Sequence, residues 1–166
     1  MTLFWTSNGA MPTTAAQVPV TTGTAIKTML QVATPSAKTL KVVAFGCEFA
    51  NALTAPVTVE LVETAAVAAT VTAHVAAGVQ PYGADALGGA SSMTLGASAT
   101  GYTASAEGTV TATRTFKYKI LPVGATSYEW EWSMGREPIV GVSKILRVRM
   151  TTSVAVNAYA WILFDE

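Results

Sequence analysis

The sequence has few charged residues. Only 12% of its 166 residues are Asp, Glu, Lys or Arg, about half the ~25% of an average soluble domain. Ten basic residues balance ten acidic ones, so the formal net charge is zero. The basic residues are scattered, whereas a protein that neutralises nucleic-acid phosphates carries them in clusters. Near-zero charge favours association. We therefore expect a protein that works in an assembly and binds no nucleic acid.

Cysteine and histidine occur once each, as Cys47 and His74. A single cysteine excludes an intramolecular disulfide and a multi-cysteine metal site. Phe45 and Phe49 flank Cys47, which predicts a buried thiol. His74 falls on the threonine-bearing side of an alternating stretch, so we expect it to face solvent or an interface. One His and one Cys in separate strands have no recognised metal-ligand spacing, and we predict no metal and no cofactor.

Motifs for catalysis are also missing. A Ser-His-Asp triad would have to use His74, and the chain has no Gly-x-Ser-x-Gly elbow, no phosphate-binding glycine loop and no calcium loop. Glu129 and Glu131 lie two residues apart and would suit a glycosidase pair. The simpler interpretation is cross-strand pairing with Lys117 and Lys119, which share that spacing. We predict a protein that is not an enzyme, has no catalytic residues and has no small-molecule substrate.

Targeting and membrane-spanning signals are not evident. The N-terminus has no basic segment followed by an apolar one, which a secretory signal requires. The most apolar run, residues 65–77, is too short for a membrane helix. We expect no membrane partner and synthesis in a reducing cytoplasm.

An alternation of apolar and polar residues with a period of two runs through most of the chain. This period is the signature of a strand with one wet face. It predicts strands at residues 26–32, 40–49, 57–61, 70–75, 109–120, 128–132, 146–150 and 154–164. The segment 154–164 is apolar on both faces and must be covered on both, by a loop or by another subunit. Strands without convincing helices predict an all-β fold, an antiparallel β-sandwich or jelly roll of about eight strands.

Two segments interrupt this pattern. Residues 1–25 carry no charged side chain and no helical period, so we predict an extended N-terminal arm followed by a single domain at 26–166. The arm would pack on a neighbouring subunit or be a frayed terminus, and Met11 is an alternative start. Residues 78–108 are rich in Gly and Ala, which predicts a long loop lying on a neighbouring surface, with a short strand at 93–95.

Several segments carry a resemblance to a known group of proteins. They are TLKVVAFG (39–46), VTVEL (57–61), ATVTAHV (69–75), GVQPY (78–82), GYTASAEG (101–108), GREP (135–138) and LRVR (146–149). Together they are similar to small structural proteins of actinobacterial phages and prophages, over roughly residues 20–166. The resemblance implies a capsid decoration (cement) protein that sits as a homotrimer on the major capsid protein lattice. The expected location is the capsid exterior of the virion, and the host cytoplasm during assembly.

Aromatic and arginine side chains are the expected anchors of such contacts. The candidates for a protein interface are Phe4, Trp5, Tyr82, Arg136 and Trp161. An alternative is a carbohydrate-binding module on a tail or fibre. Trp130 and Trp132 would then stack on sugars, with Glu129 and Glu131 beside them. Placement on head or tail stays open at this point.

Overall fold

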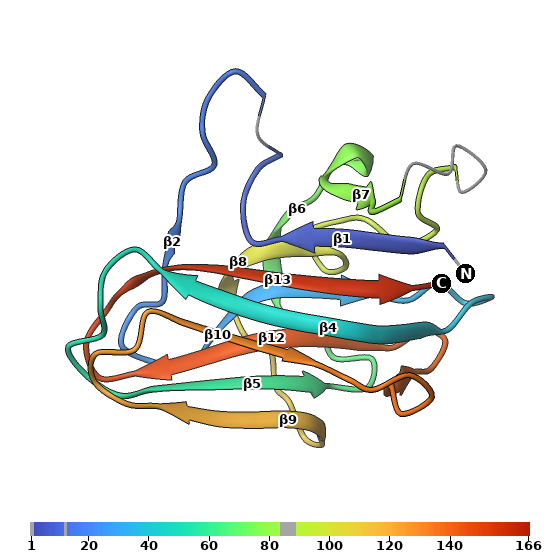
Figure 1. Cartoon of the computed structure of the whole chain (residues 1–166). Coiled ribbons are helices and arrows are strands. Elements are labelled where there is room, and N and C mark those ends of the chain that lie inside the picture. Colours follow the sequence, from blue (N-terminus) through green and yellow to red (C-terminus); the bar gives the residue numbers. More distant parts are fainter. Residues whose placement is uncertain (1, 12, 84–88) are drawn as a thin grey trace.

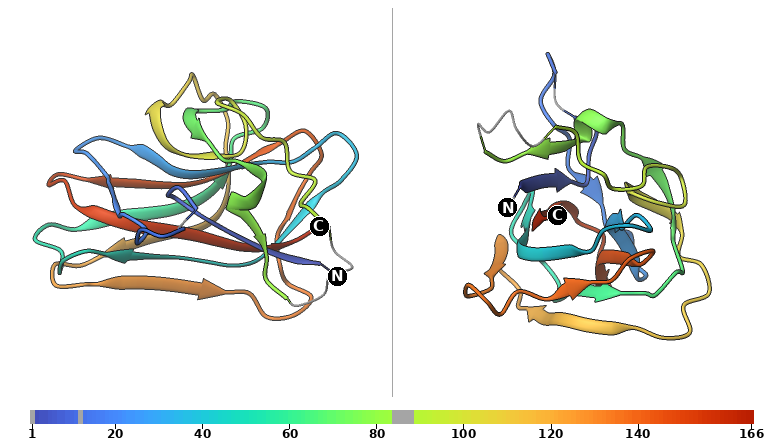
Figure 2. Two further views of the ribbon diagram at one scale, coloured as in Figure 1. Left: turned by 90° about the horizontal axis from the view of Figure 1, so that it is seen from above. Right: turned by 90° about the vertical axis from the view of Figure 1, so that its right-hand side faces the viewer.

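The computed structural model describes residues 2–11, 13–83 and 89–166, and shows two antiparallel sheets packed face to face (Figures 1 and 2). In strand order, sheet A consists of β10 (Ser127–Glu131), β4 (Leu40–Phe49), β13 (Asn157–Asp165), β1 (Leu3–Ser7) and β7 (Val79–Pro81). Two short strands join it, β11 (Ile139–Val140) beside β4 and β2 (Val20–Thr21) beside β13.

Sheet B packs against sheet A and has six strands. Their order is β6 (Thr70–Ala73), β8 (Gly101–Ala106), β3 (Lys27–Ala33), β12 (Ile145–Thr152), β5 (Val57–Glu63) and β9 (Arg114–Leu121). One 3-10 turn, η1 (Ala76–Gly78), precedes β7. The predicted β-sandwich is confirmed. The described residues form more strands than the eight predicted, because short strands at 3–7, 20–21, 79–81, 101–106 and 139–140 lack a clear alternation.

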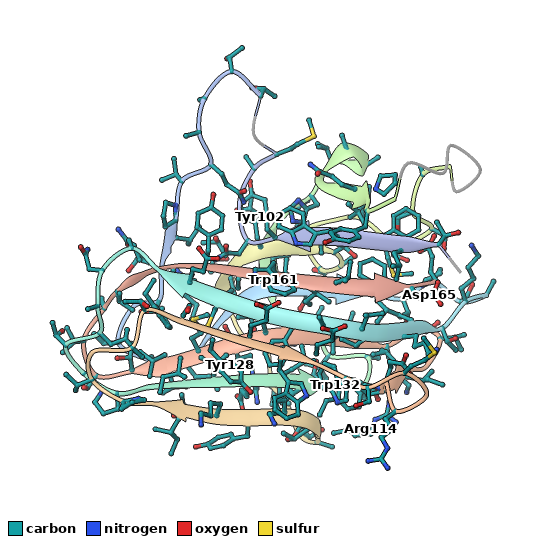
Figure 3. The ribbon with its side chains drawn as sticks, viewed as in Figure 1. Tyr102, Arg114, Tyr128, Trp132, Trp161 and Asp165 are labelled. Atoms are coloured by element: carbon teal, nitrogen blue, oxygen red, sulfur yellow. The ribbon has the colours of Figure 1, made fainter. Side chains whose placement is uncertain are left out.

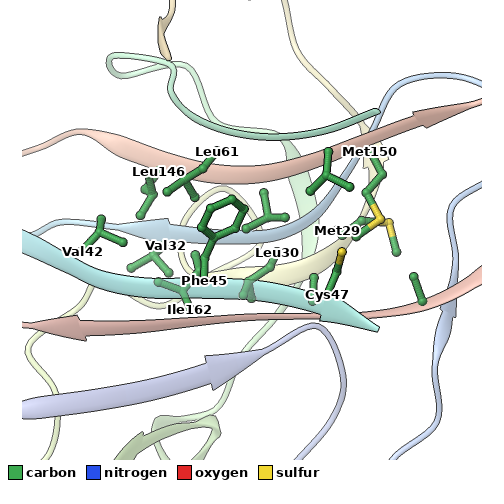
Figure 4. Packing of buried hydrophobic residues seen from close by; sticks show 14 of the residues in the cluster. Met29, Leu30, Val32, Val42, Phe45, Cys47, Leu61, Leu146, Met150 and Ile162 are labelled. Atoms are coloured by element: carbon green, nitrogen blue, oxygen red, sulfur yellow. The ribbon is translucent and has the colours of Figure 1, made fainter. Parts of the chain in front are cut away.

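The core lies between the two sheets (Figure 4). Alternate residues of β4 and β13 point into it, among them Phe45, Ile162 and Phe164, each with no exposed surface. Leu61 and Leu146 face them from sheet B. Because a strand turns every second side chain to the same face, the apolar period seen in the sequence is the one that fills this core.

The first strand replaces the predicted N-terminal arm. β1 lies inside sheet A, paired with β13 on one side and β7 on the other. Phe4 is fully buried and stacks on Phe164 with ring centroids 5.9 Å apart. Among the described residues of the predicted arm, those between β1 and β2 project from the sandwich (Figure 1). The prediction of an arm over residues 1–25 is therefore wrong for β1 and β2, whose backbone hydrogen bonds bind them into sheet A.

The glycine-rich segment 78–108 is also part of the sandwich. β7 and β8 both lie within it, and Met93 is buried in the core. Thr94 bridges to Ala33, where we predicted a short strand. The prediction of a loop on a neighbouring surface is wrong for these parts, because their polar backbone groups pair within the chain. Residues 84–88 of the predicted loop lie outside the described residues.

The outer face of sheet B is covered by loops. In the predicted strand 146–150, Arg147 lies on the polar side of the alternation, which predicts exposure to water, yet its side chain is fully buried. Its guanidinium donates to the Glu107 carbonyl (2.9 Å) and to the Val67 carbonyl, and lies 3.3 Å from the Glu107 carboxylate. That carboxylate accepts from the Thr28 backbone N–H (2.5 Å) and hydroxyl (2.6 Å). These bonds hold the loops that follow β5 and β8 against sheet B.

Strand β9 does not keep its apolar residues on one buried face: Phe116 packs on the core, but Tyr118 and Ile120 do not. Its start at Arg114 leaves residues 109–113 of the predicted strand outside. Lys117 lies opposite buried Leu61, whereas Tyr118 and Ile120 are more than half exposed. β9 is an edge strand, so a lysine there can turn along the sandwich side and reach water. The Lys117 ammonium lies 3.0 Å from the centre of the Trp130 ring.

Candidate functional site

The outer face of sheet A carries a hollow of about 390 Å³. Three of the five predicted interface residues line it: Trp5 of β1, Trp161 of β13, and Tyr82, which follows β7. These strands come from opposite ends of the chain and from its middle, and the sheet pairing brings them together. Tyr82 is 63% exposed and its backbone N–H donates to the Leu3 carbonyl (2.8 Å). The hollow is thus an open aromatic surface built on backbone pairing.

Trp161 lies at the centre of sheet A, where β13 and β4 run side by side (Figure 3). Its indole covers Gly46 of β4, and a Cβ at that glycine would lie 2.6 Å from the ring. Any side chain larger than hydrogen at residue 46 would therefore displace the indole. The missing side chain at Gly46 lets Trp161 reach across β4 towards β10.

Glu129 and Glu131 line the same hollow from β10. Glu129 and Trp161 are both in register with Gly46, and Glu131 and Leu163 are both in register with Ala44. Residues directly opposite each other in an antiparallel sheet share a face, so these carboxylates stand in the same rows as Trp161 and Leu163. Both glutamates are exposed, and neither takes part in an ion pair within the described chain.

The predicted pairing of Glu129 and Glu131 with Lys117 and Lys119 is wrong. β10 belongs to sheet A and pairs with β4, while β9 belongs to sheet B and pairs with β5. Strands consecutive in the chain often pair, but here the connection crosses between the sheets.

Trp130 and Trp132 do not share a face with the two glutamates. Trp132 stacks on the core residue Phe45 (5.9 Å between ring centroids), on the inner side of sheet A. Lys117 covers one side of Trp130. The aromatic residues beside the glutamates are instead Trp161, Trp5 and Tyr82. The alternation along β10 already placed the tryptophans and the glutamates on opposite faces of the strand. Only the pairing of sheet A showed which aromatic residues lie beside the glutamates.

Two predicted interface residues lie elsewhere. Phe4 is a core residue, because β1 turns Phe4 inward and Trp5 outward. Arg136 is exposed in the turn between β10 and β11, away from the residues that line the hollow, and its backbone N–H donates to the Ser133 carbonyl (2.9 Å). The carboxylate of the neighbouring Glu137 lies 3.7 Å from the Lys41 ammonium.

Sequence reasoning missed Ala44 and Leu163 as parts of the hollow, and Gly46 as the residue that the Trp161 indole covers. The signal for it was present in the last strand, whose outer residues Tyr159, Trp161 and Leu163 are large and apolar. We expected a loop or another subunit to cover this face. In the described chain these three side chains are partly buried on the face of sheet A that carries the hollow.

Cys47 and His74 are both buried. Burial raises the pKa of Cys47 to about 12, so the thiol stays protonated, as predicted for a buried cysteine. The prediction for His74 is wrong: the residue is 5% exposed, and the centroid of its ring lies 4.8 Å from that of the Tyr102 ring. Its Nε2 lies 2.8 Å from the Ser7 carbonyl and so carries the proton of the neutral ring. Burial lowers the pKa of His74 below 6.5, opposed by this hydrogen bond.

Within the described ranges, no three His, Cys, Asp or Glu side chains gather as metal ligands would. No helix among those residues is long and apolar enough to cross a membrane.

The fold and site define an antiparallel β-sandwich with an aromatic and acidic hollow on the outer face of one sheet. Neither protein-family models, nor curated proteins, nor solved structures match this chain significantly.

Proposed function

We propose that this protein is a non-enzymatic virion structural protein, a capsid decoration protein that binds the major capsid protein lattice and stabilises the head. The observation that carries the proposal is the convergence of Trp5, Tyr82 and Trp161 in one exposed hollow. Trp and Tyr dominate the binding energy of protein interfaces when they cluster at the centre of the contact. The phage context comes from the resemblance of residues 20–166 to actinobacterial phage structural proteins.

Two further features support a binding role. The segment between β1 and β2 projects from the sandwich and carries no charged side chain, so it can be buried against another subunit at little desolvation cost (Figure 1). The zero net charge removes long-range repulsion between copies. Both fit a homotrimer on the head surface, where each copy contacts its neighbours and the lattice.

The test uses heads that lack this protein. We expect the purified protein to bind empty and filled heads at a fixed stoichiometry, and to restore their resistance to heat and salt. Trp161→Ala should weaken binding, since it removes the central ring of the hollow. Ile139→Ala, an exposed residue of β11 outside the hollow, is the control and should bind as the wild type does. Cryo-electron microscopy that places the protein only on tails would refute the decoration role.

A second candidate function is carbohydrate binding by a tail or fibre module. The observation that favours it is the Trp161 indole lying over Gly46, in register with Glu129, which resembles a stacking surface with a hydroxyl acceptor beside it. A glycan array or a host cell-wall pull-down tests it. Saturable binding that is lost in Trp161→Ala and kept in Trp130→Ala would promote this function over decoration.

A further inference from the structure

The charged groups of the hollow all have the same sign. Of its seven lining residues, only Glu129 and Glu131 are charged, and both are negative. A carboxylate only accepts hydrogen bonds, and an ammonium or guanidinium only donates them. The other polar groups of the lining, the indole N–H groups of Trp5 and Trp161 and the Tyr82 hydroxyl, carry no charge. Two adjacent carboxylates with no basic side chain in the lining favour a cationic ligand.

The charges around the hollow strengthen this bias. Glu48 points outward from the same face and is exposed, in register with Tyr159 on the row beyond Trp161. Lys41 is the basic residue of β4, and it lies 3.7 Å from the Glu137 carboxylate. Among the described residues, Glu48, Glu129 and Glu131 on this face form no ion pair with a lysine or arginine.

The aromatic part of the hollow fits the same ligand. Trp161, Trp5 and Tyr82 lie on one side of the hollow, and Glu129 and Glu131 on the other. A cation placed over an indole ring is attracted by the ring's quadrupole, and Trp is the best partner. The chain makes such a contact elsewhere, where the Lys117 ammonium covers Trp130. Rings beside carboxylates are therefore complementary to a cation on both sides.

We infer that this hollow receives an arginine side chain of the partner protein, held between Trp161 and the carboxylates of Glu129 and Glu131. A guanidinium is planar, stacks on aromatic faces and donates a fork of hydrogen bonds to carboxylates, whereas an ammonium is a more strongly hydrated point charge. The inference rests on the proposed function, because it takes the partner to be a protein that docks on sheet A. It adds what the partner must present at the centre of that contact.

The test measures the four indole N–H signals of the ¹⁵N-labelled protein during titration with N-acetyl-arginine amide. We expect the Trp5 and Trp161 signals to shift saturably, while Trp130 and Trp132, on the other face of sheet A, stay in place. N-acetyl-citrulline amide, a neutral analogue of similar shape, should cause no saturable shift. The lysine analogue should bind more weakly. Equal shifts with citrulline, or saturable shifts only with chito-oligosaccharides, would overturn the inference.

Variants distinguish the contribution of the carboxylate charges to arginine binding from that of the aromatic rings. Glu129→Gln combined with Glu131→Gln should weaken arginine binding by at least about tenfold, because two charge-assisted contacts are lost. Glu48→Gln removes the same kind of charge outside the hollow and should change binding less than about twofold, through screened long-range attraction alone. Gly46→Ala should also weaken binding by displacing the Trp161 ring. Glu48, Glu129 and Glu131 are exposed, so the melting temperatures of the glutamine variants should stay close to wild type.

Failure of this inference is distinguishable from failure of the proposed function. If the Glu129→Gln, Glu131→Gln protein binds heads as tightly as wild type, docking stands and the cation site is refuted. If arginine amide saturates the hollow but the wild-type protein does not bind heads, the cation site stands and decoration is refuted.

Discussion

Removal of the Glu107 carboxylate tests whether the outer face of sheet B is held by a buried ion pair. The Arg147 side chain has no exposed surface, and the Glu107 side chain is 24% exposed. Glu107→Ala leaves the guanidinium with two carbonyl partners at most, Val67 and residue 107 itself, and leaves the Thr28 N–H without its acceptor. Burial lowers the pKa of Arg147 but leaves the guanidinium charged, so this charge cannot be relieved by losing a proton.

The expected cost is large because a charge remains buried without its partner. Breaking a buried pair in this way costs about 3–5 kcal/mol. For a domain of this size each kcal/mol shifts the melting temperature by about 2–4 °C, so Glu107→Ala should melt about 6–20 °C lower. Thermal and urea unfolding at pH 7 measure the loss.

The double variant Glu107→Gln, Arg147→Met is the matched control. It removes both charges while keeping similar volume, and replacing a buried pair by well-packed neutral groups is often neutral or stabilising. It should therefore recover most of the stability lost in Glu107→Ala. The reasoning would be refuted if Glu107→Ala lost less than about 1 kcal/mol, as an exposed pair does, or if the double variant were as unstable as the sum of the single ones.

Three more predictions concern buried residues of the sandwich. Because the pKa of His74 is lower in the folded protein than its ordinary 6.5, the unfolded chain takes up the proton first as the pH falls. The stabilising contribution of His74 should be full above pH 6.5 and decline below it. His74→Gln should flatten this part of a plot of melting temperature against pH. An unchanged slope would contradict a lowered pKa at His74. Cys47 should not react with a disulfide reagent at pH 8 in the native protein and should react fully in guanidinium chloride, since its pKa is about 12 and it is buried; rapid native reaction would show that β4 opens. A chain that begins at Met11 should be insoluble or unfolded because it lacks β1. Phe4→Ala alone should lower the free energy of unfolding by about 3–5 kcal/mol. A stable, cooperatively unfolding Met11 product would show that β1 is dispensable.

The site was only partly predictable. Trp5, Tyr82 and Trp161 were expected to bind a partner, and Glu129 and Glu131 were expected to belong together, but no pattern in the chain placed the five in one hollow. Pairing of β1 with both β13 and β7, and of β10 with β4, does so. These contacts join residues far apart in the sequence, and alternation within a strand carries no information on which strand lies beside it.

The sequence by itself determined that the protein is a β-sandwich and where most of its longer strands run. The reason is local: a period of two assigns alternate side chains to opposite faces. Only the tertiary structure decided what covers each face. Arg147 and His74, read as facing water, are buried by loops and by β1, whereas Tyr118 and Ile120 are exposed because β9 is an edge strand. A pattern shows that two faces differ, and the packing of distant segments decides which of them meets solvent.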